Sequence, residues 1–177
     1  MKNLKNILKK EIFPISLIFI LAFAKLVPHP PNFTPIIAVA IMSGYLFRNI
    51  YLSLAILSIS MFLADVFIGF YNNMLFTYLS LFLIAFVFFK IGKKIDFKNF
   101  FIYGFIGSLI FFIVSNFGVW ILGSPGVNDI AYEKTLAGLV ECYILAIPFF
   151  TNTLLSTIIF CYAALIANNI YAKKIAR

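Results

Sequence analysis

The chain has 177 residues, of which 63% are hydrophobic and only 11% are charged, and its mean hydropathy is +1.05. A soluble domain is roughly half apolar and about a quarter charged, so this composition excludes a protein that faces only water and predicts a lipid bilayer as its surroundings. The net charge of +8 would favour nucleic-acid binding in a soluble protein. Here the charges lie between apolar runs, as is typical of loop residues that set membrane topology, so no nucleic acid is expected as a partner.

A spanning helix needs about 20 predominantly apolar residues, and the sequence predicts an all-α bundle of six transmembrane helices in one integral-membrane domain, residues 1–177. The first predicted span covers residues 12–27 and ends before Pro28, because proline disfavours helix in the residue that precedes it. A rigid, proline-rich connection follows, and a short second span covers residues 34–47.

The third, fourth and fifth spans are expected at residues 51–70, 74–89 and 100–122. A lysine-rich loop precedes the fifth span, and a loop containing two glycines and a proline follows it.

The remaining apolar section, residues 135–171, is too long for one straight span and contains Pro148. We therefore expect residues 136–147 to form a broken, re-entrant or interfacial helical segment, and the last span to start near Asn152. Non-helical backbone at membrane depth is tolerated only where protein or a cavity covers it.

The distribution of lysine and arginine predicts the orientation of the bundle, because cytoplasmic loops carry an excess of both. With the N-terminus inside, twelve basic residues lie on the cytoplasmic side, and only Lys25 and Lys134 lie on the other. The expected protein is a multi-pass inner-membrane protein with both termini in the cytoplasm.

Polar residues gather near the outer ends of the predicted spans, whereas the inner halves are nearly all apolar. Ionisable groups inside a membrane are costly and usually face a bundle interior or a cavity. We therefore expect a solute-binding site near the outer face, with these candidate residues: Lys25, His29, Asn32, Asp65, Tyr71, Asn116, Trp120, Glu141, Tyr143 and Asn152.

The candidates divide by chemistry, and each class has a structural alternative. The charged residues would meet charged groups on the solute, but Asp65 could instead pair with Lys25, whose side chain could also reach the interface. The amides would hydrogen-bond the solute or a neighbouring helix. The aromatic residues would form walls around the solute or belong to the aromatic belts at the membrane interfaces. His29, between prolines, is expected to be structural or solvated.

No enzyme motif is present: the sequence has no Walker motif, no GxSxG and no HExxH. The two cysteines are isolated in apolar stretches and there is a single histidine, so neither a metal site nor a cofactor is expected. Without a phosphate-binding loop, any ATP-driven step requires another subunit.

Four stretches resemble an uncharacterised bacterial integral-membrane family: residues 28–35 (PHPPNFTP), 65–70 (DVFIGF), 116–120 (NFGVW) and 142–154 (CYILAIPFFTNTL). Residues 58–69 are also similar to the third-helix region of the substrate-binding S components of energy-coupling-factor vitamin transporters. That resemblance implies a protein that captures a small vitamin-like solute from outside and passes it to a transmembrane coupling subunit driven by ATPases.

Two other functions stay open. A self-sufficient, ion-coupled small permease would use a carboxylate such as Asp65 or Glu141. A non-transporting membrane scaffold would depend on its lipid-facing helix surfaces instead.

Overall fold

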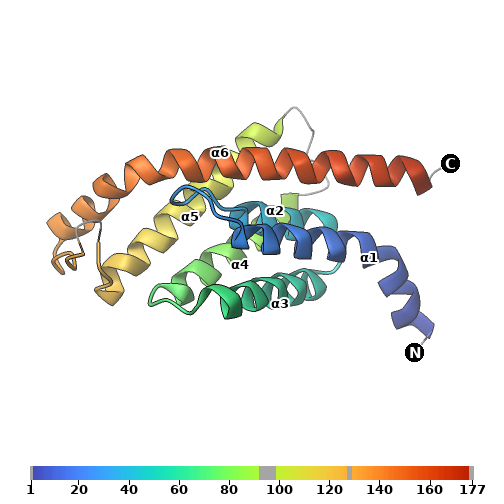
Figure 1. The fold of residues 1–177 in the computed structure, drawn as a ribbon, viewed down its shortest axis with the longest axis horizontal. Coiled ribbons are helices and arrows are strands. Elements are labelled where there is room, and N and C mark those ends of the chain that lie inside the picture. Colours follow the sequence, from blue (N-terminus) through green and yellow to red (C-terminus); the bar gives the residue numbers. More distant parts are fainter. Residues whose placement is uncertain (1, 92–98, 127–128, 176–177) are drawn as a thin grey trace.

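The structure, a computed structural model, describes residues 2–91, 99–126 and 129–175. Its described part is all-α, as predicted, with six α-helices and one short 3₁₀ helix (Figure 1). The elements in chain order are α1 (Lys2–Phe23), η1 (Ala24–Leu26), α2 (Ile36–Leu46), α3 (Ile50–Ile68), α4 (Met74–Ile91), α5 (Phe100–Leu122) and α6 (Leu136–Ile175).

Four of the described helices, α3 to α6, are long and apolar enough to cross a bilayer, which supports a multi-pass membrane protein. The helix α2 has only 11 residues, and at 1.5 Å per residue it is about 16 Å long, roughly half the thickness of the hydrocarbon core. The prediction of six transmembrane helices is therefore confirmed only in part: the described residues form six α-helices, of which four are long and apolar enough to span a bilayer.

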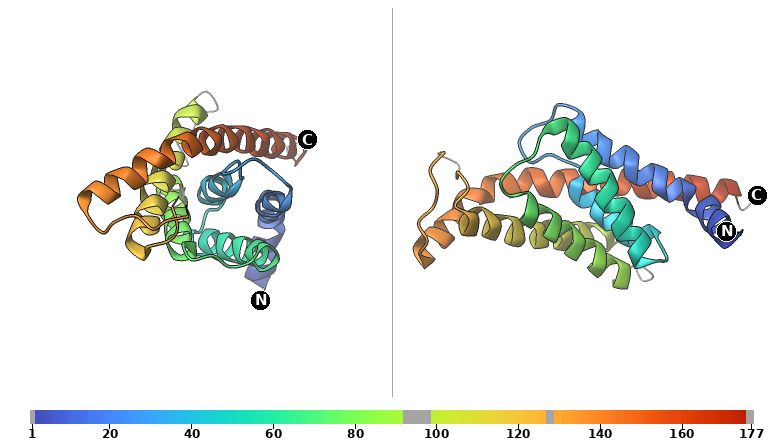
Figure 2. Two further views of the ribbon diagram at one scale, coloured as in Figure 1. Left: turned by 60° about the vertical axis from the view of Figure 1, so that its left-hand side comes forward. Right: turned by 90° about the horizontal axis from the view of Figure 1, so that it is seen from below.

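The short helix α2 is the centre of the bundle. Every residue from Ile36 to Gly44 is buried, and α2 packs against α1, α3, α4, α5 and α6 (Figure 2). A helix that is apolar on all sides belongs in a protein core or in a bilayer, and the burial of residues 36–44 assigns α2 to the core of this bundle. Gly44 allows the closest approach, because a Cβ at this position would overlap the carbonyl oxygen of Ala85 on α4.

The predicted interruption before the last span is not shown. Residues 136–147 and the expected final span belong to the single 40-residue helix α6, which passes through Pro148. A proline removes one backbone hydrogen bond, and membrane helices tolerate this where side chains, water or a local adjustment of the helix satisfies the freed carbonyl group. Figure 1 shows α6 curving in its first third, the part that contains this proline.

The helix ends separate into two sets. The N- and C-termini lie at one end of the molecule, and the α5–α6 connection lies at the opposite end, where α5 and α6 extend beyond the other helices (Figure 1). The η1–α2 and α3–α4 connections also point toward this second end but stop short of it. This difference in length leaves one face of α5 and α6 without a full-length neighbour.

Candidate functional site

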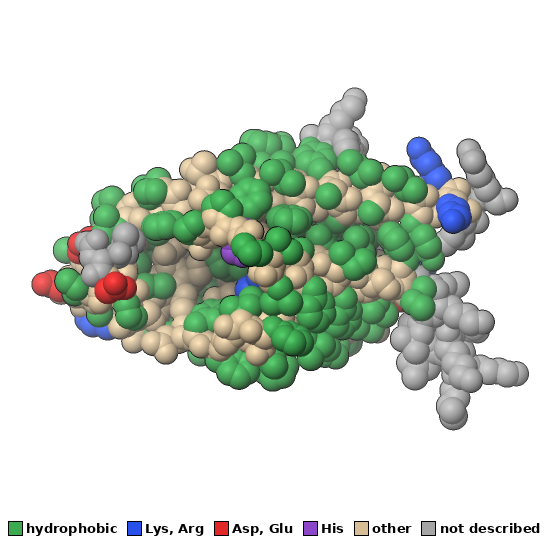
Figure 3. Space-filling model, viewed as in Figure 1, with side chains coloured by type: hydrophobic (Ala, Val, Ile, Leu, Met, Phe, Trp, Pro, Cys, Tyr) green, Lys and Arg blue, Asp and Glu red, His purple; other side chains and the backbone are tan. Residues whose placement is uncertain are grey.

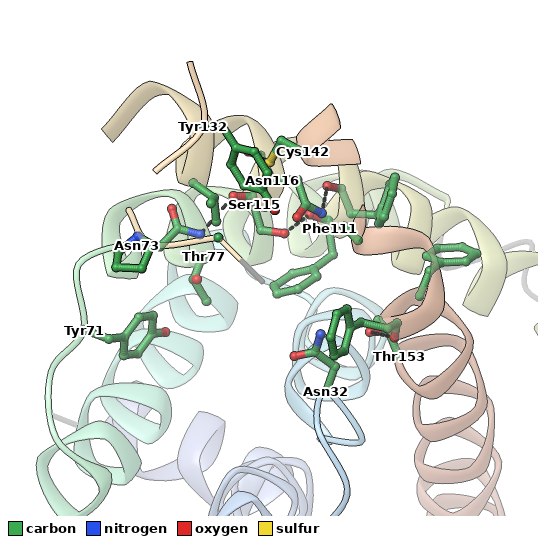
Figure 4. A pocket seen from close by; sticks show the side chains of 17 residues that line it. Asn32, Tyr71, Asn73, Thr77, Phe111, Ser115, Asn116, Tyr132, Cys142 and Thr153 are labelled. Atoms are coloured by element: carbon green, nitrogen blue, oxygen red, sulfur yellow. Dashed lines mark hydrogen bonds between the residues drawn. The ribbon is translucent and has the colours of Figure 1, made fainter. Parts of the chain in front are cut away.

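A cavity of about 370 Å³ lies beside the projecting parts of α5 and α6, where Figure 3 shows the surface hollowed. Its walls come from α4, α5, α6 and all three connections at this end (Figure 4). The lining residues are Asn32, Tyr71, Asn73, Thr77, Phe111, Phe112, Ser115, Asn116, Val119, Pro125, Gly126, Tyr132, Cys142, Ala146, Phe149, Phe150 and Thr153.

The α6 wall follows the helical repeat without interruption. Its lining residues, Cys142, Ala146, Phe149, Phe150 and Thr153, have the spacing of one helix face. Because residues before and after Pro148 belong to this same face, the proline does not change the direction in which the side chains point. The phenylalanines give this wall an apolar centre, with Cys142 and Thr153 at its ends.

The η1–α2 connection brings irregular backbone to the cavity. Asn32 lies in the left-handed region with φ of 59° and lines the cavity from the side of α6, opposite Tyr71 (Figure 4). The side-chain amide of Asn152 on α6 donates to the carbonyl oxygen of Pro31 at 3.0 Å and so fastens this connection to the cavity rim. Irregular backbone at membrane depth is tolerated where it lines a water-filled space.

The α4–α5 side of the cavity is closely packed and polar. The Asn73 amide nitrogen donates to the Ser115 carbonyl oxygen at 2.9 Å, while the amide oxygen of Asn73 is buried and has no hydrogen-bond partner in the described structure. Gly118 permits this contact, because a Cβ there would overlap Asn73 and Phe76. An unsatisfied buried acceptor is rare and costs free energy.

The α5–α6 connection covers the far end of the cavity through Pro125, Gly126 and Tyr132. It is held by Trp120, whose indole nitrogen donates to the Glu133 carbonyl oxygen at 2.8 Å. The Lys134 ammonium in turn donates to the Trp120 carbonyl oxygen and lies 5.6 Å from the centre of the Trp120 ring.

A buried ion pair lies beside the cavity without lining it. Lys25 Nζ on η1 is 2.5 Å from Asp65 Oδ1 on α3, and the Tyr78 hydroxyl donates to Asp65 Oδ2 at 2.7 Å. Lys25 Nζ also lies 5.6 Å from the centre of the Tyr71 ring. Burial raises the pKa of the Tyr71 phenol above its ordinary value of 10.0, so its hydroxyl, which is protonated at neutral pH in any case, also stays protonated at alkaline pH.

A model of one protein family matches residues 5–176 of the chain. The chain belongs to the family of unknown function DUF6580. No curated protein and no solved structure matches the chain. The function of this DUF6580 member is therefore inferred from its fold and its cavity.

Three of the ten predicted site residues, Asn32, Tyr71 and Asn116, line the cavity together. Asn116 also donates to the carbonyl oxygen of Phe112 on its own helix at 2.8 Å. Lys25 and Asp65 satisfy each other, which is the alternative that the sequence left open.

The other five predicted residues lie outside the cavity. Trp120 and Asn152 fasten the connections described above, and the Tyr143 hydroxyl donates to the Ile113 carbonyl oxygen on α5 at 2.8 Å. Glu141 is exposed on α6, and exposed His29 has Nδ1 3.0 Å from the Pro30 carbonyl oxygen.

Sequence reasoning missed several lining residues that directly adjoin predicted ones. Ser115 precedes Asn116 and Thr153 follows Asn152, and one residue along a helix turns the side chain by about 100°. The rotation of each helix about its own axis decides which of two neighbouring residues faces the cavity. Thr153 was missed because side-chain amides, not hydroxyls, were chosen as the candidate hydrogen-bonding groups. Tyr132 and Cys142 had no distinguishing signal in the sequence.

The chemistry of the lining is polar but uncharged. Among the residues described, no lysine, arginine, histidine or acidic residue lines the cavity, and no group of three His, Cys, Asp or Glu side chains could hold a metal ion. The lining offers amides, hydroxyls and aromatic rings, which suit a small uncharged molecule with hydrogen-bonding edges.

Proposed function

We propose that the chain is a membrane substrate-capture subunit that binds a small, vitamin-like, uncharged solute in this cavity from the extracytoplasmic side. The cavity, with its uncharged polar and aromatic lining at one end of the bundle, is the observation that carries the proposal. A pocket of a few hundred Å³ with a few convergent polar groups is the usual form of a small-molecule site.

The orientation follows from charge. Among the residues described, the end that bears both termini carries Arg48, Lys90, Lys173 and Lys174 and the four lysines in the first half of α1, so it belongs in the cytoplasm by the positive-inside rule. The cavity then opens outward, at the end where acidic side chains gather (Figure 3). Residues 27–35 together with α2 complete the second of six crossings, which brings both termini to the cytoplasm.

The residues that line the cavity change the charge expected for the solute. Lys25, Asp65 and Glu141 were expected to meet charged groups, but the first two neutralise each other and Glu141 is exposed elsewhere. A charged solute would lose its hydration without gaining an opposite charge, at a high free-energy cost. We therefore favour a neutral compound with an aromatic or heterocyclic ring.

The release step needs a partner. The sequence holds no nucleotide-binding motif, so the proposed capture subunit delivers its solute through a transmembrane coupling subunit with ATPases, as the resemblance to S components implies.

A thermal-shift screen of purified protein against uncharged water-soluble vitamins and their precursors tests the proposal. A ligand should raise the melting temperature of the wild type but not of Asn116→Leu, whose lost amide otherwise bonds only its own helix. Asn169→Leu, the same change at an exposed site near the opposite end of the bundle, should keep the shift. A ligand that shifts all three proteins equally binds elsewhere and contradicts the proposal.

A second candidate, the ion-coupled permease, is favoured by the buried Lys25–Asp65 pair, because intramembrane carboxylates mark proton and ion pathways. It predicts uptake by proteoliposomes that contain this chain alone and loss of that uptake in Asp65→Asn. The capture subunit predicts binding but no accumulation in the same vesicles.

A further inference from the structure

A second cavity lies at the opposite end of the bundle, among the helix ends near the termini. It measures about 810 Å³ and is lined by Pro14 on α1, Asn168 on α6, Phe89 and Lys90 on α4, and residues 44–48, which end α2 and lead to α3. The cavity exists because α2 is short. Figure 1 shows α1 and α6 continuing past the end of α2, so the central helix leaves space between its longer neighbours.

The lining combines two positive charges with an apolar wall. Arg48 and Lys90 are both exposed, and Leu46, Phe47 and Phe89 provide carbon surface beside them. Among the residues described, the Arg48 side chain makes no hydrogen bond or ion pair. The one contact of the Lys90 ammonium with a described side chain is a cation–π contact, in which Nζ lies 5.5 Å from the centre of the Phe86 ring. Glu11, one helical turn before Pro14, is the only described acidic residue at this end and pairs with neither cation.

We propose that this cavity binds the headgroup of an anionic phospholipid, with Arg48 and Lys90 holding its phosphate group. A guanidinium offers paired donors that match phosphate oxygens, and an ammonium adds a point charge. Basic pockets between transmembrane helices on the cytoplasmic side are suited to such headgroups. The apolar wall accommodates the upper acyl chains, which a free phosphate ion would not use. The inference does not depend on solute capture at the other end.

Native mass spectrometry of the delipidated full-length protein tests the site. The protein is titrated with phosphatidylglycerol and, separately, with phosphatidylcholine that carries the same acyl chains. The wild type should bind the anionic lipid in preference, and Arg48→Gln/Lys90→Gln should weaken that binding roughly ten- to thirty-fold. Lys173→Gln/Lys174→Gln removes the same charge from exposed positions at the same end, outside the cavity, and should keep the preference.

Three results would overturn the proposal. Equal binding of the two lipids would show that the cavity does not select an anion. An equal loss in the two double variants would assign the effect to net charge alone. Displacement of phosphatidylglycerol by millimolar inorganic phosphate would identify a phosphate-ion site. Melting temperatures of both variants near that of the wild type establish that the comparison is between folded proteins.

Discussion

The ammonium of Lys25 lies 2.5 Å from a carboxylate oxygen of Asp65, 40 residues further along the chain. The pair joins η1 to α3, and the Tyr78 hydroxyl on α4 bonds the second carboxylate oxygen. One carboxylate thus connects three elements next to the cavity. Because Asp65 is fully buried, its charge is tolerated only with these partners.

Replacing Asp65 by asparagine should destabilise the protein by about 3 kcal/mol, because removing one partner leaves the other charge buried and unpaired. The cost should be near the lower end of the known range, since Lys25 lies close to a helix end and its side chain can reach water. Adding Lys25→Met should recover most of the loss, because an amide oxygen still accepts from Tyr78. Thermal unfolding in detergent measures both variants, and a double variant no more stable than Asp65→Asn would show that the charge pair is not the cause.

A methyl group at Gly44 should disrupt the centre of the bundle. A Cβ there overlaps backbone atoms of α4, which cannot rotate away, so Gly44→Ala should cost about 3 kcal/mol or prevent folding. Gly104→Ala is the matched control. Its Cβ would lie 3.3 Å from the flexible Ile158 side chain, and the higher helix propensity of alanine offsets part of the strain. Size-exclusion profiles and melting temperatures of the two variants should differ clearly; similar behaviour would refute the close α2–α4 packing.

Loss of the Asn152 side chain should loosen the η1–α2 connection. The Asn152→Ala variant removes one hydrogen bond to the Pro31 carbonyl oxygen, worth about 1 kcal/mol, so local opening of residues 27–35 should become about five-fold more frequent. Hydrogen–deuterium exchange measures this change. Exchange in α2 should stay slow, because that helix is buried among the others, and unaltered exchange in residues 27–35 would show that the contact does not hold the connection.

The sequence predicted that the chain is all-α and gave the ranges of several helices, but it did not predict which face of each helix lines the cavity. The range predicted for the fifth span, 100–122, coincides with α5, because apolar length and the Gly123 terminus are local features. The continuous α6 was missed, since a proline inside a helical pattern usually marks a break, whereas this helix passes through Pro148. The second span was predicted to be short, at residues 34–47, and α2 is shorter still. Its burial on all sides was not predicted, because that depends on how the other helices pack around it.

The candidate site was predictable in its position along the bundle but not in its detail. Polar residues near one set of helix ends indicated where a cavity would lie, and Asn32, Tyr71 and Asn116 line it. Whether Asp65 faces a solute or a lysine depends on its contact with Lys25, which lies 40 positions earlier in the chain. The spacing of residues in the sequence does not predict such a contact. Thr153 and Tyr132 depend in the same way on helix rotation and on how a connection folds back.

Solvent access to Asn116 tests the central claim, a water-filled cavity that opens outward, most directly. In a background in which both native cysteines are replaced by alanine, intact cells are treated from outside with a charged, membrane-impermeant methanethiosulfonate. Asn116→Cys should react. Two controls should not react: Ile113→Cys, which is 49% exposed in the structure but lies outside the cavity lining, where we expect lipid, and Ser108→Cys, which is buried in the bundle. If Asn116→Cys is no more reactive than these two controls, the cavity is closed or dry and the protein does not capture a solute there.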